Sequence, residues 1–165
     1  MRAKIVLLGL AGIAVLCSTG CGDQPKPAAS PAQPATAAKS QGVKPVDETH
    51  RLPKQNLVES KVVDRELMGK AFMPGGTLAH YKKGKLEYDV FLAHMVDANA
   101  AVFALPDWRK ALTDARLVPS FGGYFGLDGD RPVFVFSKGS WLAGVAGLPQ
   151  KDADAIAREV AARLD

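Results

Sequence analysis

The sequence predicts a single small α+β domain with a mostly antiparallel sheet of about five strands and three or four helices. Residues 77–95 and 121–146 alternate apolar with polar residues around glycine-containing turns, which is typical of hairpins. Residues 150–165 carry an apolar stripe at helical spacing. All 12 aromatic residues lie between Phe72 and Trp141, and they supply enough apolar material for one compact core.

The first element expected in the domain is a helix over residues 57–72, where apolar residues are spaced among charged ones. The segment 73–76, which reads MPGG, ends this helix because proline and glycine break helices. Residues 77–95 then form a hairpin with its turn at Lys83 and Gly84. One face of its second strand carries Leu86, Tyr88, Val90 and Leu92.

Helices are expected between the hairpin and the next strands, and again at the end of the chain. Asp97 can cap a helix that continues to Leu105, and Pro106 interrupts it. A second helical piece follows over 107–115. The last helix, over 150–165, has an apolar stripe that consists of Ala153, Ile156, Ala157, Val160, Ala161 and Leu164.

A three-stranded meander is expected over 121–127, 132–137 and 140–146, with turns at Asp128-Gly129 and Lys138-Gly139. This register places on one face Phe121, Phe125, Phe134, Phe136 and Trp141. The other face is shallow and carries Gly122, Tyr124, Gly126, Gly144 and Ala146. The alanine-rich last helix is expected to pack on that shallow face.

The N-terminal part of the chain is predicted to lie outside the domain. Residues 1–20 begin with Arg2 and Lys4 and continue with an apolar run of 13 residues, which is too short to cross a bilayer and indicates a secretory signal peptide. Residues 21–46 are rich in proline and alanine and cannot bury enough surface to fold. They form a tether that reaches roughly 75 Å at about 3 Å per residue. The globular domain therefore spans 47–165.

The excess positive charge of the chain lies outside the predicted domain. The whole chain has a formal charge of +4. Five of its 21 Lys and Arg residues, but only one of its 17 Asp and Glu residues, precede residue 47, so the domain carries 16 charges of each sign. A neutral domain lacks the basic surface that binds phosphate backbones, so nucleic acid is not an expected partner.

Both cysteines, Cys17 and Cys21, precede the predicted domain, so no disulfide framework is expected in it. The residues Ser18-Thr19-Gly20-Cys21 resemble the lipobox of bacterial lipoprotein precursors, in which small residues precede an acylated cysteine; Ser18 stands where leucine is usual. The resemblance covers the first two dozen residues only. It implies cleavage between Gly20 and Cys21 and a diacylglycerol on the sulfur of Cys21.

The same resemblance implies a location. Gly22 rather than aspartate follows the cysteine, as in lipoproteins that are sent to the outer membrane. The expected protein is therefore anchored by lipid in the bacterial cell envelope, at the outer membrane and facing the periplasm. Acyl chains such as palmitate hold a domain firmly, since each buried methylene contributes about 0.8 kcal/mol. The alternative is an ordinary signal peptide with an incidental cysteine.

The segment 121–126, which reads FGGYFG, combines three aromatic residues with three glycines and suggests two roles. As a stacking platform it would bind a sugar ring or another flat ligand, with Tyr124 and Trp141 as the ligand-binding residues. As part of the core it would bury its rings against neighbouring strands. Core packing explains most of the pattern, and the binding role stays open beside it.

No catalytic residue, metal site or cofactor is predicted. His80 can face Glu87 across the hairpin, but His94 lies too far past the paired region to share a zinc ion with them. The chain contains no H-E-x-x-H, C-x-x-C, P-loop or G-x-G-x-x-G motif. The candidate nucleophiles are Ser120, Ser137 and Ser140, and none of them lies in a G-x-S-x-G motif.

The sequence thus predicts a lipid-anchored cell-envelope protein with a non-enzymatic binding or structural domain. Its partner would be an envelope protein, a glycan or a small molecule. The alternative is an envelope hydrolase whose site is assembled only by the fold. A hydrolase requires a serine or aspartate within hydrogen-bond reach of His80 or His94 in a cleft, and this feature separates the two hypotheses.

Overall fold

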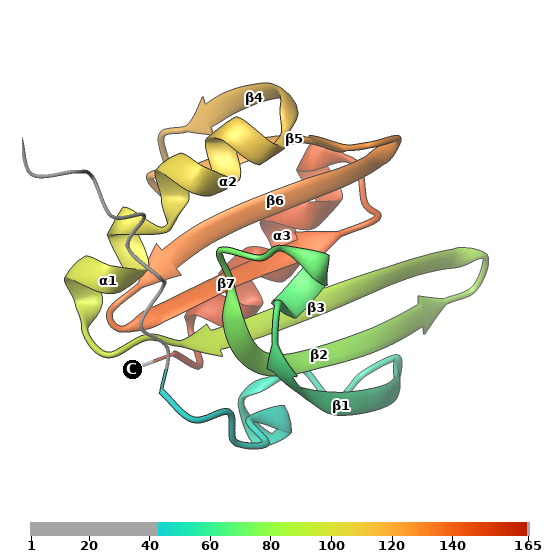
Figure 1. The fold of residues 1–165 in the computed structure, drawn as a ribbon. Helices are drawn as coiled ribbons and strands as arrows, with labels where there is room; N and C mark the ends of the chain where they lie inside the picture. Colours follow the sequence, from blue (N-terminus) through green and yellow to red (C-terminus); the bar gives the residue numbers. More distant parts are fainter. Residues whose placement is uncertain (1–42, 165) are drawn as a thin grey trace, which may run out of the picture. The chain divides into compact units, whose positions relative to one another are not determined.

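A computed structural model describes residues 43–164 of the chain (Figure 1). The predicted signal peptide, Cys21 and most of the predicted tether lie outside the described residues. Two hydrogen bonds tie the end of the tether to the domain: the Val43 N–H donates to the His94 carbonyl (3.1 Å), and the Thr77 hydroxyl donates to the Val46 carbonyl (3.1 Å). Residues 43–46 therefore pack as part of the domain.

The seven strands of the described residues form one antiparallel sheet in the order β1-β2-β3-β7-β6-β5-β4 (Figure 1). Pairing of β3 with β7 joins the first three strands to the last four, and α1 and α2 carry the chain from β3 to the far edge strand β4. The elements in chain order are η1 (Thr49–Arg51), β1 (Leu57–Arg65), η2 (Leu67–Gly69), β2 (Pro74–Lys83), β3 (Leu86–His94), α1 (Ala98–Phe103), α2 (Leu105–Ala111), β4 (Thr113–Val118), β5 (Gly123–Asp128), β6 (Arg131–Lys138), β7 (Trp141–Ala146) and α3 (Gln150–Ala161).

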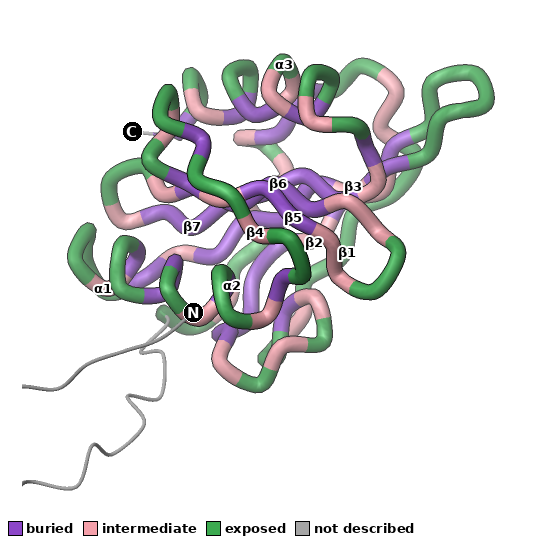
Figure 2. Tube along the Cα trace, turned by 90° about the horizontal axis from the view of Figure 1, so that it is seen from above, coloured by how far each residue is buried: buried purple, intermediate pink, exposed green. Residues whose placement is uncertain are grey.

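Helices cover both faces of the sheet, with α1 and α2 on one face and α3 on the other (Figure 2). A separate apolar cluster fills each side. The cluster under α3 contains Phe134 and Phe136, and the cluster under α1 and α2 contains Phe91 and Trp108. Because β6 is covered on both faces, its central sequence VFVF is apolar without interruption rather than alternating.

The predicted fold class is wrong, because the sheet has seven strands rather than five and two segments expected to be helical are edge strands. Residues 57–65 of the predicted helix 57–72 form β1, which pairs only with β2. Edge strands can expose both faces, so β1 shows no alternation of apolar and polar residues. At the opposite edge, residues 113–118 form β4, although 113–115 were expected to be helical.

The hairpin turns lie one residue later than predicted. A shift of one residue in a turn moves the pairing by two residues, and side chains alternate with a period of two, so each residue keeps its predicted face. Phe134 accordingly pairs with Phe125 rather than with Gly123. The observed turn residues are Gly84-Lys85, Gly129-Asp130 and Gly139-Ser140.

The last helix packs on the opposite face from the one expected. Ala157 and Val160 of α3 lie in the same cluster as Phe134 and Phe136, on the aromatic face of the meander. The shallow face is instead covered by α1 and α2, and at Gly144 the space that the glycine leaves is filled by the Phe91 ring of β3, which stacks on Trp108 of α2. The small residues of this face therefore make room for an aromatic ring beneath α2 rather than for the last helix.

Candidate functional site

An open cleft of about 440 Å³ lies between α3 and the strands beneath it, and we call it the α3 cleft. Its residues come from three separate parts of the chain: the β4–β5 connection, the end of β6, and α3. The lining residues are Ser120, Phe121, Phe136, Ser137, Lys138, Arg158 and Ala161. The volume is within the range of pockets that hold small organic molecules.

The apolar floor of the α3 cleft is formed by Phe121, which is half-buried, and Phe136, which is 1% exposed. The ring of Phe121 lies 4.9 Å from that of Phe136 and meets Phe134 edge-on at 5.3 Å, so neighbouring rings hold it in place. A turn presents Phe121 to the cleft: the N–H groups of Phe121 and Gly122 both donate to the Val118 carbonyl. Gly122 has a φ of +66°, a conformation that favours glycine.

The rim of the α3 cleft is polar and basic. The Arg158 guanidinium lies 5.2 Å from the Phe121 ring centroid and pairs with Asp154, one turn earlier on α3, at 2.8 Å. Lys138 is exposed at the end of β6 and forms no ion pair within residues 43–164. The hydroxyl of Ser120 likewise has no hydrogen-bond partner in that part of the chain. These groups are available to a ligand.

The structure places the two predicted ligand-binding residues, Tyr124 and Trp141, on opposite faces of the sheet. Trp141 is 3% exposed, and its ring stacks on His94 at 4.4 Å with the Arg51 guanidinium 4.9 Å away. Tyr124 is half-buried against the cluster under α1 and α2. Neither residue lines the α3 cleft, and the fold does not bring them together.

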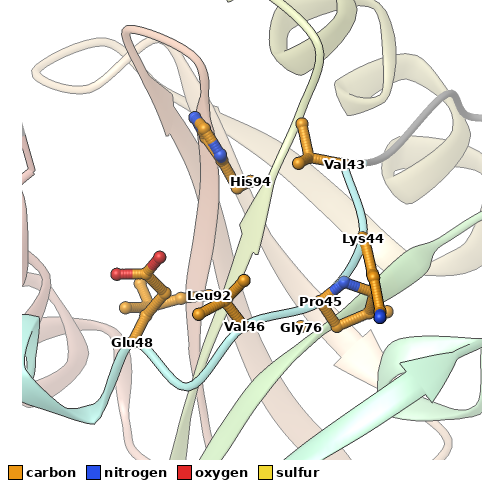
Figure 3. A pocket seen from close by; sticks show the side chains of 9 residues that line it. Val43, Lys44, Pro45, Val46, Glu48, Gly76, Leu92 and His94 are labelled. Carbon is orange, nitrogen blue, oxygen red and sulfur yellow. The ribbon is translucent and has the colours of Figure 1, made fainter.

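One serine does come within reach of a histidine. The His94 Nε2 and Ser140 Oγ atoms are 3.0 Å apart, a distance that suits a nucleophile and its base. His94 lines a cavity of about 30 Å³ behind residues 43–46, which has room for water but not for a substrate (Figure 3). Ser140 does not line this cavity. The small cavity that His94 lines therefore does not bring a substrate to this pair.

A second histidine forms a pair with a carboxylate. The predicted partner of His80 was Glu87, but His80 Nδ1 lies 2.8 Å from Asp89, whose other oxygen binds Arg131 at 2.8 Å. Glu87 instead accepts a hydrogen bond from Lys82, which lowers the pKa of its carboxyl. An open cleft of about 230 Å³ beside this network is lined by Glu59, Lys61, Leu78, His80 and Asp89, and no serine, threonine or cysteine is among them.

Among residues 43–164, no three histidine, cysteine, aspartate or glutamate side chains are grouped so that they could hold a metal ion. Within the same range, no helix is both long enough and apolar enough to cross a bilayer.

The described residues form a three-layer domain, with an antiparallel sheet between two layers of helices (Figure 2). The α3 cleft, which has an aromatic floor, lies on its surface between α3 and the end of β6. No family model, no curated protein and no solved structure matches this chain. The sequence patterns singled out Phe121 as a core or stacking residue and Ser120 as a candidate nucleophile. Lys138 was expected only as a turn residue, and no pattern pointed to Arg158. Lys138 and Arg158 line the same cleft only because α3 packs over the end of β6.

Proposed function

We propose that this protein is a lipid-anchored protein of the bacterial cell envelope, placed at the outer membrane, whose domain binds a small organic ligand in the α3 cleft without catalysis. The observation that supports binding is the combination of a rigid, half-buried Phe121 ring with nearby polar groups, Ser120 and Lys138, that have no partner within residues 43–164. Apolar pockets with a few convergent polar groups are typical of ligand sites.

The anchor is supported by the sequence around Cys21 and by the composition of the segment that follows it. Two or three acyl chains on one cysteine are enough to keep a soluble domain at a membrane. The proline- and alanine-rich segment then allows the domain to bind its ligand at a distance from the bilayer.

The lack of a histidine or carboxylate base in the α3 cleft supports binding without catalysis. No histidine, cysteine or carboxylate is among the residues that line the cleft, so Ser120 and Ser137 have no adjacent imidazole or carboxylate that could take their proton there. A serine hydroxyl is a weak nucleophile unless such a base activates it.

The anchor is tested by the Cys21→Ala variant of the full chain, expressed in bacteria with a clickable palmitate analogue. We expect the wild-type protein to take up the label and to sediment with outer membranes. The variant should lose both properties while its domain keeps its circular dichroism spectrum. Membrane association of an unlabelled Cys21→Ala protein contradicts the proposed anchor.

Binding in the cleft is tested by a thermal-shift screen of small organic molecules on the full-length protein. Ligands that raise the melting temperature of the wild type should fail to do so for Phe121→Ala, because the apolar floor is lost. Leu117→Ala is the matched control, since Leu117 is a 55% exposed apolar residue outside the cleft. Stabilisation that survives in Phe121→Ala places the ligand elsewhere.

The contact between His94 and Ser140 favours a second candidate function, an envelope hydrolase. In that case Ser140 attacks an acyl substrate and His94 accepts its proton. A fluorophosphonate probe, which labels activated serines, distinguishes the two functions. Labelling of the wild type that is lost in Ser140→Ala supports the hydrolase, and no labelling supports binding alone.

A further inference from the structure

We infer that the ligand of the α3 cleft is an amphipathic anion: a flat apolar group that carries a carboxylate, sulfonate or phosphate. This inference rests on the proposed binding function and names the class of ligand. It is carried by the charges that line the cleft and by the shape of its floor.

The charge of the cleft lining is positive. Its two ionisable side chains are those of Lys138 and Arg158, and no aspartate or glutamate is among the lining residues. Asp154 neutralises part of the Arg158 charge from the same helix. Glu159, the neighbour of Arg158 in sequence, pairs with Arg163 at 2.9 Å.

The charge of Lys138 stays uncompensated, because it has no ion pair within the described part of the chain. Along β6, Lys138 is two residues after Phe136, so the two side chains leave the strand on the same face. The ammonium group is thus carried on the side of the sheet that forms the cleft floor. A ligand anion placed over that floor would meet Lys138 at one end.

The positive charge is a property of this site and not of the whole domain. Residues 47–165 contain equal numbers of acidic and basic residues, so there is no general attraction for anions. Selection of an anion therefore depends on where Lys138 and Arg158 lie. The hydroxyl of Ser120, which also lines the cleft, adds a donor for a ligand oxygen.

The floor favours a flat group. Phe121 is restrained on two sides by Phe134 and Phe136, so its accessible surface is fixed before any ligand binds. The planar guanidinium of Arg158 lies over that ring, 5.2 Å from its centroid, and can stack on a ligand with the plane that faces away from Phe121. A flat apolar group gains contact with this plane and with the part of Phe121 that stays exposed, and an acidic substituent on it reaches toward Lys138.

The test compares two probes of equal shape and different charge, 2-naphthoate and 2-naphthamide. Each is titrated by calorimetry into the full-length protein in neutral phosphatidylcholine nanodiscs, with empty nanodiscs as the blank. We expect the wild type to bind 2-naphthoate about fivefold more tightly than 2-naphthamide, as befits one partly exposed ion pair. Added salt should reduce that preference.

The Lys138→Gln variant should lose this preference by weakening the binding of 2-naphthoate about fivefold, while the affinity for 2-naphthamide stays unchanged. Lys85→Gln is the matched control, because Lys85 is an exposed lysine at the β2–β3 turn, away from the cleft. It should behave like the wild type. Exposure of Lys138 makes unfolding of the variant unexpected, and circular dichroism checks this.

Different failures can be told apart. If the wild type binds both probes equally well, the inference of an anionic ligand is overturned while cleft binding stands. If Lys138→Gln keeps the preference, the assignment of that preference to Lys138 is overturned. If Phe121→Ala binds both probes as tightly as the wild type does, the probes bind elsewhere, and the proposed binding site falls together with the inference.

Discussion

Phe91 and Gly144 are paired directly across β3 and β7, and the ring of Phe91 covers the glycine. A Cβ atom on residue 144 would lie 2.3 Å from Cζ of Phe91, which is closer than real contacts allow. The same ring stacks on Trp108 of α2, with centroids 5.4 Å apart. A glycine at the centre of the sheet thus makes the space in which Phe91 and Trp108 pack, an aromatic–glycine pairing also used to stabilise sheets.

Gly144→Ala should lower the free energy of unfolding by about 1–3 kcal/mol, since the added methyl group overpacks the core. The Phe91 ring can give way, but the Phe134 carbonyl, 2.6 Å from the same Cβ position, cannot move without disturbing the sheet. The double variant Gly144→Ala/Phe91→Leu should lose less free energy of unfolding than the sum of the two single variants, because the smaller leucine makes room for the added methyl group. Urea unfolding checks both values, and an unchanged Gly144→Ala protein contradicts this packing.

Trp141→Ala should destabilise the domain by about 3–5 kcal/mol, because the ring is 3% exposed and lies in the cluster under α3. Trp141→Phe, which keeps an aromatic ring next to His94, should cost less. Thermal melting of the two variants is the measurement. An unchanged melting temperature together with lost ligand binding would instead favour the stacking platform suggested by the sequence.

Asp97→Ala should destabilise the protein by about 1 kcal/mol through loss of a helix cap. The Asp97 carboxylate accepts a hydrogen bond from the Ala100 N–H at 2.7 Å, at the start of α1. Asp97→Ser keeps a capping oxygen and should lie within a few tenths of a kcal/mol of the wild type. Chemical denaturation of both variants checks the cap, and equal losses would show that the carboxylate acts in another way.

The domain should lose stability in alkaline solution because of two buried tyrosines. Burial raises the pKa of Tyr81 and of Tyr88 above the ordinary value for a phenol. The folded state therefore holds these protons more tightly than the unfolded state does. The resulting stabilisation is complete below about pH 10 and declines above it, by up to about 1.4 kcal/mol per pH unit for each tyrosine.

Tyr81→Phe tests this pH dependence. At neutral pH the variant should be about 1 kcal/mol less stable, since the hydroxyl donates to the Pro53 carbonyl at 2.8 Å. Between about pH 8 and about pH 11 its unfolding free energy should fall less steeply than that of the wild type, because only Tyr88 of the pair still titrates. Urea unfolding at both pH values gives the slopes. If the unfolding free energies of the wild type and of Tyr81→Phe fall equally steeply, the alkaline sensitivity comes from other groups.

Local patterns predicted the elements that lie inside the molecule better than those at its edges. The hairpin 77–95 and the strands of the meander were expected where β2, β3 and β5–β7 are found, each within a few residues. Helix 150–165 was likewise expected where α3 lies. The edge strands β1 and β4 were missed, because a strand with one neighbour can be polar on both faces and has no period to detect.

The candidate site was less predictable than the fold. Trp141 and Tyr124 attracted attention as aromatic residues, yet burial on opposite faces separates them. The cleft uses Phe121, from the same segment as Tyr124, together with Lys138 and Arg158. No spacing in the sequence relates these three residues, because they are brought together only when α3 covers the aromatic face.

Composition and short-range periodicity were enough to predict the neutral charge of residues 47–165, the faces of the meander strands and the position of the last helix. The two edge strands, the face that α3 covers and the residues of the α3 cleft depend on long-range packing and could not be predicted in this way. The physical reason is that side-chain volume selects between the faces of a sheet. The Phe91 ring at Gly144 packs beneath α1 and α2, and α3 packs on the other face, where Phe134 and Phe136 lie.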